Sequence, residues 1–223
     1  MSNAIIFDMD GTLFQTNTIL EPSLINTFDM LREKAIWSGS TPLKQYPQIM
    51  GVPLPVVWET LLPNTTIEIR EYANELFNER LIENIKQGKG SLYPNVIETL
   101  DTFKENGIPM FIATNGLTMY LQAIVSYFGL NRWISGTYSV QQIDSLDKSE
   151  LVKMITKEHG IKTGAVVGDR LSDFIAAKSN ELTAIGCHFD FAKEEELKQA
   201  DFVIHEFDGL TDYFLGFMNG LNY

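Results

Sequence analysis

Two carboxylates stand two residues apart near the start of the chain, in the run Asp8-Met9-Asp10-Gly11-Thr12-Leu13. An apolar run, Ala4 to Phe7, comes directly before them. Side chains two apart leave a strand on the same side, so we expect both carboxyl groups to lie close together. That arrangement is useful if one carboxylate binds a cation and attacks a substrate while the other carries a proton. A surface turn holding two acids is the alternative.

A second acid pair, Asp169 and Asp173, follows the apolar run Ala165 to Gly168. Asp169 is expected at a strand tip, and Asp173 in the first turn of the helix that begins near Leu171. A carboxylate in a first turn also stabilises a helix by itself. Four acids at one sheet edge would repel one another unless a divalent cation that prefers oxygen ligands, most simply Mg²⁺, neutralised them.

Two further polar sites complete the set. Thr114-Asn115-Gly116 ends another apolar run and offers a hydroxyl, an amide and a turn. These groups suit a phosphoryl oxygen, but taken alone the motif favours a helix N-cap. Lys148 is expected at the start of a helix, where a cation opposes the helix dipole and a purely structural role is less favourable. Lys153 and Lys157 are its rivals.

Short apolar runs alternate with helical patterns, which indicates an α/β fold with a parallel sheet. Strands are expected at 4–7, 110–113, 165–168, 183–185 and 202–204, and helices at 94–105, 117–128 and 148–159. Ligands of such sheets bind at the carboxyl ends of the strands, where the polar residues above stand.

Residues 14–90 break this alternation and carry only helical patterns, expected near 22–35, 43–50, 53–62 and 66–87. We therefore expect an α/β core of residues 1–14 and 91–223, with an all-helical domain of residues 15–90 inserted after the first strand. In this inserted domain, the candidate residues for binding a substrate's anionic group are Arg32, Lys34, Lys44 and Arg70. The rings of Trp58 and Tyr46 could stack on a sugar or base. Surface charge and ordinary packing are the alternatives for these six residues.

Composition narrows the classes of function. The formal net charge of −12 argues against nucleic acid or an anionic membrane as the main partner. The single cysteine, Cys187, excludes a disulfide framework and a thiolate metal cluster. No apolar stretch approaches a membrane span, and the N-terminus lacks a signal-peptide pattern, so a cytoplasmic protein is expected.

The four polar sites, in this order and spacing, resemble those of the haloacid dehalogenase superfamily. The similar subgroup is the Mg²⁺-dependent phosphatases that carry a helical cap after the first motif, such as phosphoglycolate phosphatase and β-phosphoglucomutase. The resemblance covers nearly the whole chain, and it implies a Rossmann-like core with a helical cap domain.

The resemblance also implies roles for these residues. Asp8 would be the nucleophile that forms an aspartyl-phosphate, and Asp10 the general acid and then the base. Lys148 would neutralise negative charge, and Mg²⁺ would be held by Asp8, the backbone carbonyl of Asp10, Asp169 and Asp173. Thr114, Asn115 and Gly116 would hold the phosphoryl group.

The function that follows is hydrolysis of a small phosphomonoester. A phosphomutase of the β-phosphoglucomutase kind shares all four motifs, and a non-catalytic binding protein on the same fold is the alternative from another class.

Overall fold

The computed structural model describes residues 2–46, 54–190 and 192–218. The chain forms two compact units, one of Met1–Gln15 with Ser91–Tyr223 and one of Thr16–Gly90. Among the described helices, none combines the length and the apolar character that crossing a membrane requires.

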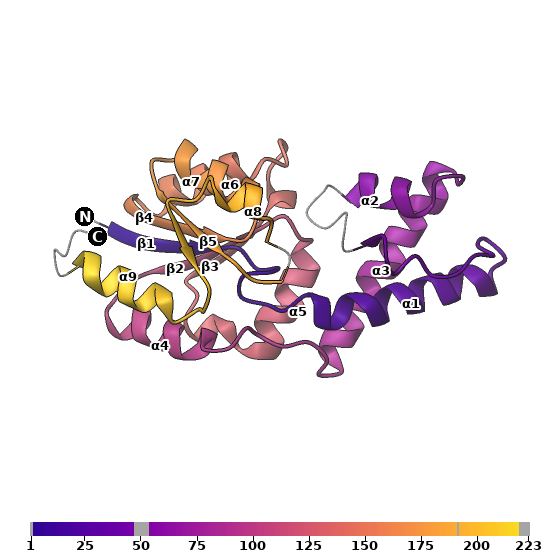
Figure 1. Ribbon diagram of the computed structural model, residues 1–223, viewed down its shortest axis with the longest axis horizontal. Coiled ribbons are helices and arrows are strands. Elements are labelled where there is room, and N and C mark those ends of the chain that lie inside the picture. The colour runs from indigo at the N-terminus through magenta and orange to yellow at the C-terminus, as the bar shows by residue number, and fades with distance from the viewer. Residues whose placement is uncertain (1, 47–53, 191, 219–223) are drawn as a thin grey trace. The chain divides into compact units, whose positions relative to one another are not determined.

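The first unit is built on one parallel sheet of six strands in the order β3-β2-β1-β4-β5-β6 (Figure 1). The strands are β1 (Ser2–Phe7), β2 (Met110–Thr114), β3 (Gly136–Ser139), β4 (Ile161–Gly168), β5 (Thr183–Cys187) and β6 (Phe202–Ile204). The prediction of an α/β fold with a parallel sheet is confirmed.

The central strand β1 is apolar because both of its faces are covered. Ile5, Ile6 and Phe7 are all 0% exposed, as is usual for a strand inside a parallel sheet. Phe7 lies opposite Ile112 of β2 and Val167 of β4. The register therefore brings the carboxyl ends of these three strands to one level of the sheet edge.

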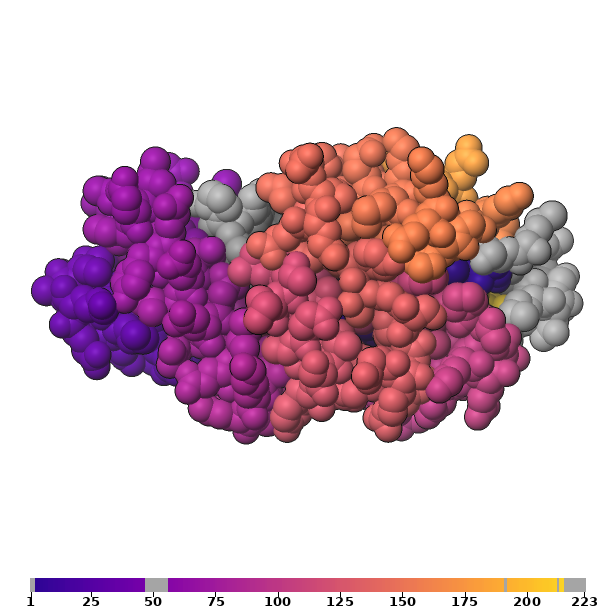
Figure 2. Space-filling view, turned by 180° about the vertical axis from the view of Figure 1, so that it is seen from behind, coloured from indigo at the N-terminus to yellow at the C-terminus, as the bar shows by residue number. Residues whose placement is uncertain are grey.

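Helices cover both faces of this sheet, with α6 and α7 on one face and α4 and α9 on the other (Figure 1). Figure 2 shows the molecule from behind. On this side, residues that come after β2 in the sequence, coloured salmon to orange, form most of the first unit's surface. The helices are α4 (Val96–Glu105), α5 (Thr118–Phe128), α6 (Lys148–Glu158), α7 (Leu171–Ser179), α8 (Glu194–Leu197) and α9 (Gly209–Met218), with 3₁₀ turns at Leu130–Arg132 and Val140–Gln142.

The described part of the second unit contains the helices α1 (Asn17–Glu33), α2 (Leu54–Leu61) and α3 (Ile67–Lys86). A buried hydrogen bond of 2.7 Å from Asn84 Nδ2 of α3 to Ser23 Oγ of α1 joins two of them. The helix expected at 43–50 is not formed at residues 43–45, which make a turn, and residues 47–50 lie outside the described part.

Trp58 of α2 is 1% exposed, with its ring centroid 6.4 Å from that of Phe28 and 5.7 Å from that of Phe77. Its Nε1 donates to Asn74 Oδ1 at 2.9 Å. Trp58 is therefore a packed aromatic residue within this unit, and the hypothesis that its ring stacks on a substrate is wrong.

Strand β3 and the start of helix α1 also differ from the sequence expectations, each for a physical reason. The strand β3 was not expected, because Gly136–Ser139 lies at the sheet edge and is only partly buried, so it carries no apolar run. The helix α1 begins at Asn17 and not at Pro22, which lies inside it. Proline is most common in a helix's first turn, and taking it as a start signal placed this boundary too late.

Candidate active site

Asp8 is the first residue after β1 and is 6% exposed. Its backbone N–H donates to the Val167 carbonyl of β4 at 2.8 Å, so pairing with the neighbouring strand continues to the carboxylate itself. Gly11 then turns the chain with φ of +76°, and a Cβ atom there would lie 2.5 Å from Asp169 Oδ2. Glycine is required at this position because any side chain would displace Asp169.

Lys148 forms ion pairs with one residue of each acid pair, Asp8 and Asp173. Its Nζ lies 2.5 Å from Asp8 Oδ1 and 2.5 Å from Asp173 Oδ1, and the side chains of all three residues are at least nine-tenths buried. Although burial opposes it, the charges of Asp173 and Asp8 raise the pKa of Lys148, so the amine is charged. The helix dipole is offset locally because Asp147, the N-cap of α6, accepts from Ser149 N–H at 2.8 Å.

The two rival lysines of α6 lie elsewhere. Lys153 pairs with Glu150 on the same helix at 3.2 Å and its side chain is 65% exposed, while Lys157 is also exposed. Lys148 is therefore the lysine of this helix that reaches the acidic cluster.

Three carboxylates form a group that fits a divalent cation. One oxygen each of Asp8, Asp169 and Asp173 lies within 4.8 Å of the others. Asp169 Oδ1 is buried and makes no hydrogen bond among the described residues. A buried carboxylate oxygen without a donor is costly, and a cation with oxygen ligands would satisfy it.

The electrostatics of the group agree with this fit. Burial raises the pKa of Asp8 to about 7, with Lys148 opposing the rise and the charges of Asp173 and Asp10 adding to it. Burial, followed by the charges of Asp8 and Asp173, likewise raises the pKa of Asp169. One lysine therefore does not fully compensate the negative charge, and a bound cation would favour the ionised carboxylates.

Thr114 ends β2 and is 1% exposed. Its Oγ1 accepts from the Gly116 N–H at 2.9 Å, and Ser139 Oγ at the end of β3 donates to the Gly116 carbonyl at 2.6 Å. The N-cap of α5 is Leu117, so the alternative in which Thr114 or Asn115 caps this helix is wrong. Asn115 is exposed, and its Nδ2 lies 3.5 Å from Ser172 Oγ.

Asp10 follows Asp8 and is partly exposed. The Tyr120 hydroxyl of α5 donates to Asp10 Oδ1 at 2.6 Å, a contact that sequence reasoning missed. The sequence carries a weak signal for it: Tyr120 lies six residues after Thr114, in the first turn of the helix that starts beside the site.

A second missed arrangement supports the loop between β4 and α7. Arg170 Nε and Nη2 donate to the two carboxylate oxygens of Glu196 at 2.9 and 3.0 Å, and Leu171 N–H donates to Glu196 Oε2 at 2.9 Å. Arg170 N–H also donates to Asp173 Oδ2 at 3.0 Å. Glu196 thereby holds the loop that carries Asp169 and Asp173 from outside the cluster.

Comparison with known proteins agrees with this geometry. Residues 5–187 match the family model described as haloacid dehalogenase-like hydrolase. A phosphoglycolate phosphatase of Agrobacterium fabrum is 26% identical, over 95% of this chain and 91% of its own. The pyrophosphatase PpaX of Halalkalibacterium halodurans is 23% identical, over 94% and 95% respectively.

Among solved structures, a predicted phosphoglycolate phosphatase of Haemophilus somnus superposes with a TM-score of 0.81 at 23% identity. That match covers 95% of this chain and 98% of the other, and it shows a shared fold. The family model spans most of the chain, including the carboxyl ends of β1, β2 and β4. The chain therefore belongs to the haloacid dehalogenase-like hydrolase family and is a phosphatase of that family.

Proposed function

We propose that the protein hydrolyses a small phosphomonoester in two steps, with Asp8 as the nucleophile. The observation that carries this proposal is the position of Lys148 Nζ, 2.5 Å from both Asp8 and Asp173. A cation held against a buried carboxylate stabilises negative charge that gathers on a phosphoryl group as it is transferred.

In the first step a carboxylate oxygen of Asp8 attacks phosphorus, and the bond from phosphorus to the leaving oxygen breaks. Asp10 donates a proton to that oxygen, so an alcohol departs and an aspartyl-phosphate remains. In the second step Asp10 takes a proton from water, and the water oxygen attacks phosphorus. Asp8 is regenerated as a carboxylate, and inorganic phosphate leaves.

The residues around this pair would bind the transferred group. Thr114 and Asn115 would donate hydrogen bonds to the phosphoryl oxygens from a side-chain hydroxyl and a side-chain amide. Gly116, whose N–H donates to Thr114 Oγ1, would hold that hydroxyl at the phosphoryl group. Lys148 would offset charge on Asp8 and on the phosphoryl group. Positioning and charge stabilisation dominate catalysis of phosphoryl transfer, so these groups need not form covalent bonds or transfer protons themselves.

Mg²⁺ would be held by Asp8, Asp169, Asp173 and the backbone carbonyl of Asp10. A bound divalent cation supplies charge neutralisation and orientation of the phosphoryl oxygens. The protein's own contribution is three buried carboxylates whose mutual repulsion disfavours the cation-free state.

The unit of residues 16–90 would act as a cap domain that selects the substrate. The relatives named for phosphoglycolate and pyrophosphate suggest small anionic phosphate compounds as the substrate class. The net charge of −12 argues against nucleic acid or a membrane surface as the partner. We propose a cytoplasmic protein whose partner is a small phosphate compound.

The test is phosphate release from a panel of phosphate compounds that includes 2-phosphoglycolate, pyrophosphate, nucleoside monophosphates and hexose phosphates. Wild type, Asp8→Asn, Asp10→Asn and the control Asp144→Asn, which changes an exposed aspartate, are compared with Mg²⁺ and with a chelator. Release that requires Mg²⁺ and Asp8, falls in Asp10→Asn and persists in Asp144→Asn supports the proposal. No release from any compound, together with interconversion of hexose phosphates, would replace it by the mutase.

A further inference from the structure

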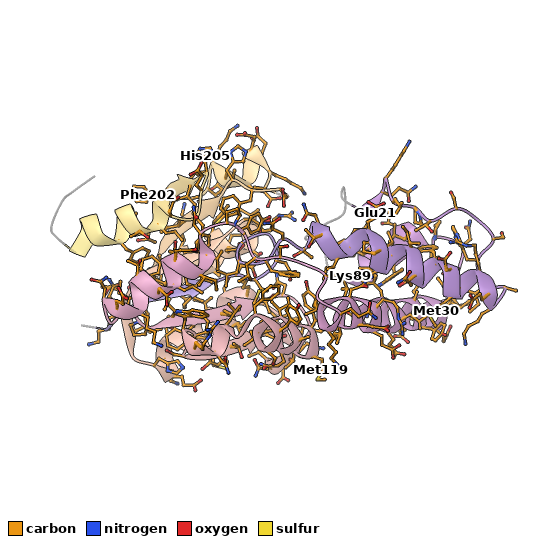
Figure 3. The ribbon with its side chains drawn as sticks, turned by 90° about the horizontal axis from the view of Figure 1, so that it is seen from below. Glu21, Met30, Lys89, Met119, Phe202 and His205 are labelled. Carbon is orange, nitrogen blue, oxygen red and sulfur yellow. The ribbon has the colours of Figure 1, made fainter. Side chains whose placement is uncertain are left out.

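Tyr120 lies in the first turn of α5 and is 4% exposed, although its neighbour Met119 is 71% exposed on the outer surface (Figure 3). The hydroxyl of Tyr120 donates to Asp10 Oδ1 at 2.6 Å, across 110 positions of sequence. A buried tyrosine usually directs its hydroxyl to a polar partner, and here that partner is the carboxyl group proposed as acid and base.

Gly116 leaves the space that this contact needs. A Cβ atom there would lie 3.3 Å from Tyr120 Cδ1, 3.5 Å from Asp10 Oδ2 and 3.2 Å from Thr114 Oγ1. A side chain at position 116 would therefore press against both the Tyr120 ring and the Asp10 carboxyl group. The Ser139 hydroxyl holds the Gly116 carbonyl at 2.6 Å, which fixes this glycine beside the pair.

The bond suits a carboxyl group that must both give and take a proton. Oδ1 can accept from Tyr120 when Asp10 is ionised, and also when Asp10 carries its proton on Oδ2. The contact therefore survives both steps of the proposed reaction. By holding Oδ1, it resists rotation of the carboxyl group.

We propose that Tyr120 is a positioning residue that orients the Asp10 carboxyl group for proton transfer to the leaving oxygen. The inference rests on the proposed role of Asp10. If Tyr120 acts through Asp10, its contribution to the rate of the first step depends on the leaving group, because only a poor leaving group needs a proton in that step.

The experiment compares kcat/KM for two substrates, since this ratio reports the reaction up to departure of the leaving group. One is 4-nitrophenyl phosphate, whose leaving group is a stable anion. The other is the alkyl phosphate that the wild-type protein hydrolyses fastest. The variants are Tyr120→Phe, Asp10→Asn and the matched control Tyr127→Phe, which changes a tyrosine of the same helix that is 49% exposed.

We expect Tyr120→Phe to lower kcat/KM for the alkyl phosphate about tenfold, and for 4-nitrophenyl phosphate by less than about threefold. Asp10→Asn should show the same selectivity with a larger loss, and Tyr127→Phe should match wild type on both substrates. A purely structural role for Tyr120 would lower both values equally.

Equal losses in Tyr120→Phe, with a selective loss in Asp10→Asn, would overturn this inference and leave the role of Asp10 intact. A loss in Asp10→Asn that does not depend on the leaving group would contradict the proposed acid itself, and the inference would fall with it. The two failures are therefore distinguishable.

Discussion

The side-chain amine of Lys148 lies 2.5 Å from Asp8 Oδ1, although 140 positions separate the two residues in the sequence. The same amine lies 2.5 Å from Asp173 Oδ1, so one buried cation links residues that follow β1 and β4. Removing one partner of a buried ion pair costs more than the pair itself contributes, because the other charge remains buried without compensation. This dependence makes the site open to tests of stability as well as activity.

Lys148→Met should impair both properties. We expect loss of about 3 kcal/mol in the free energy of unfolding without Mg²⁺, because buried carboxylates lose their cation. Activity should fall by at least about a hundredfold. Denaturant unfolding with and without Mg²⁺ measures the first effect, and Mg²⁺ should restore part of the stability.

The control for that prediction is Lys153→Met, on the same helix but 65% exposed. It should change stability by no more than about 0.5 kcal/mol. A loss in Lys153→Met as large as that in Lys148→Met would show that the effect belongs to the helix and not to the buried pair.

Asp169→Asn should stabilise the metal-free protein and abolish its response to Mg²⁺. The pKa of Asp169 is raised in the folded state. The ionised carboxylate therefore lowers the free energy of unfolding at any pH above the pKa that Asp169 has in the unfolded chain. At pH 7.5 without metal we expect a gain of about 1 kcal/mol, which shrinks as the pH falls toward 4.

Thermal unfolding at a series of Mg²⁺ concentrations measures the second half of this prediction. Wild type should gain about 2.7 kcal/mol at a Mg²⁺ concentration of one hundred times Kd. Asp169→Asn should gain almost nothing. An unchanged Mg²⁺ response in the variant would remove Asp169 from the metal site.

Glu196→Gln should lower stability in a pH-dependent manner. Hydrogen bonds from Arg170, followed by that from the Leu171 N–H, lower the pKa of Glu196 to about 2, despite partial burial. A carboxyl group whose pKa is lowered by folding contributes stability at any pH above its pKa in the unfolded chain, which is about 4.3 for glutamate. That contribution is lost as the pH falls toward 2. We expect a deficit of about 1–2 kcal/mol at pH 7 that narrows below pH 4.

Denaturant unfolding from pH 2.5 to pH 7 measures this dependence. Glu195→Gln changes a neighbouring glutamate whose side chain is 83% exposed, and it should follow the wild-type curve. A constant difference between Glu196→Gln and wild type across this range would mean that the ionised carboxylate is not what holds the loop.

The sequence predicted those parts of the molecule that depend on local patterns. Short apolar runs indicated five of the strands, and the polar residues at their ends indicated Asp8, Thr114 and Asp169. Asp173 and Lys148 followed from the expected starts of two helices. These inferences worked because a strand buried on both faces is apolar throughout, so its end is visible in the sequence.

Tyr120, Ser139 and Glu196 were not predicted, because each acts through a neighbour that is distant in sequence. Tyr120 approaches Asp10 only through the rotation of α5, which also exposes Met119. Ser139 lies at the end of an edge strand without an apolar run. Glu196 is one of three successive glutamates, and sequence alone cannot tell which of them faces Arg170.

The central claim is that Asp8 carries the phosphoryl group. The most direct test mixes Asp10→Asn with 4-nitrophenyl phosphate and Mg²⁺, because this variant should form the aspartyl-phosphate and lack the base that breaks it down. We predict a burst of one equivalent of 4-nitrophenolate and, after acid quenching, one phosphoryl group placed on Asp8 by peptide mass spectrometry. The double variant Asp8→Asn, Asp10→Asn should give neither. Steady turnover without a burst or a phosphorylated peptide, or a phosphoryl group on another residue, would contradict the account.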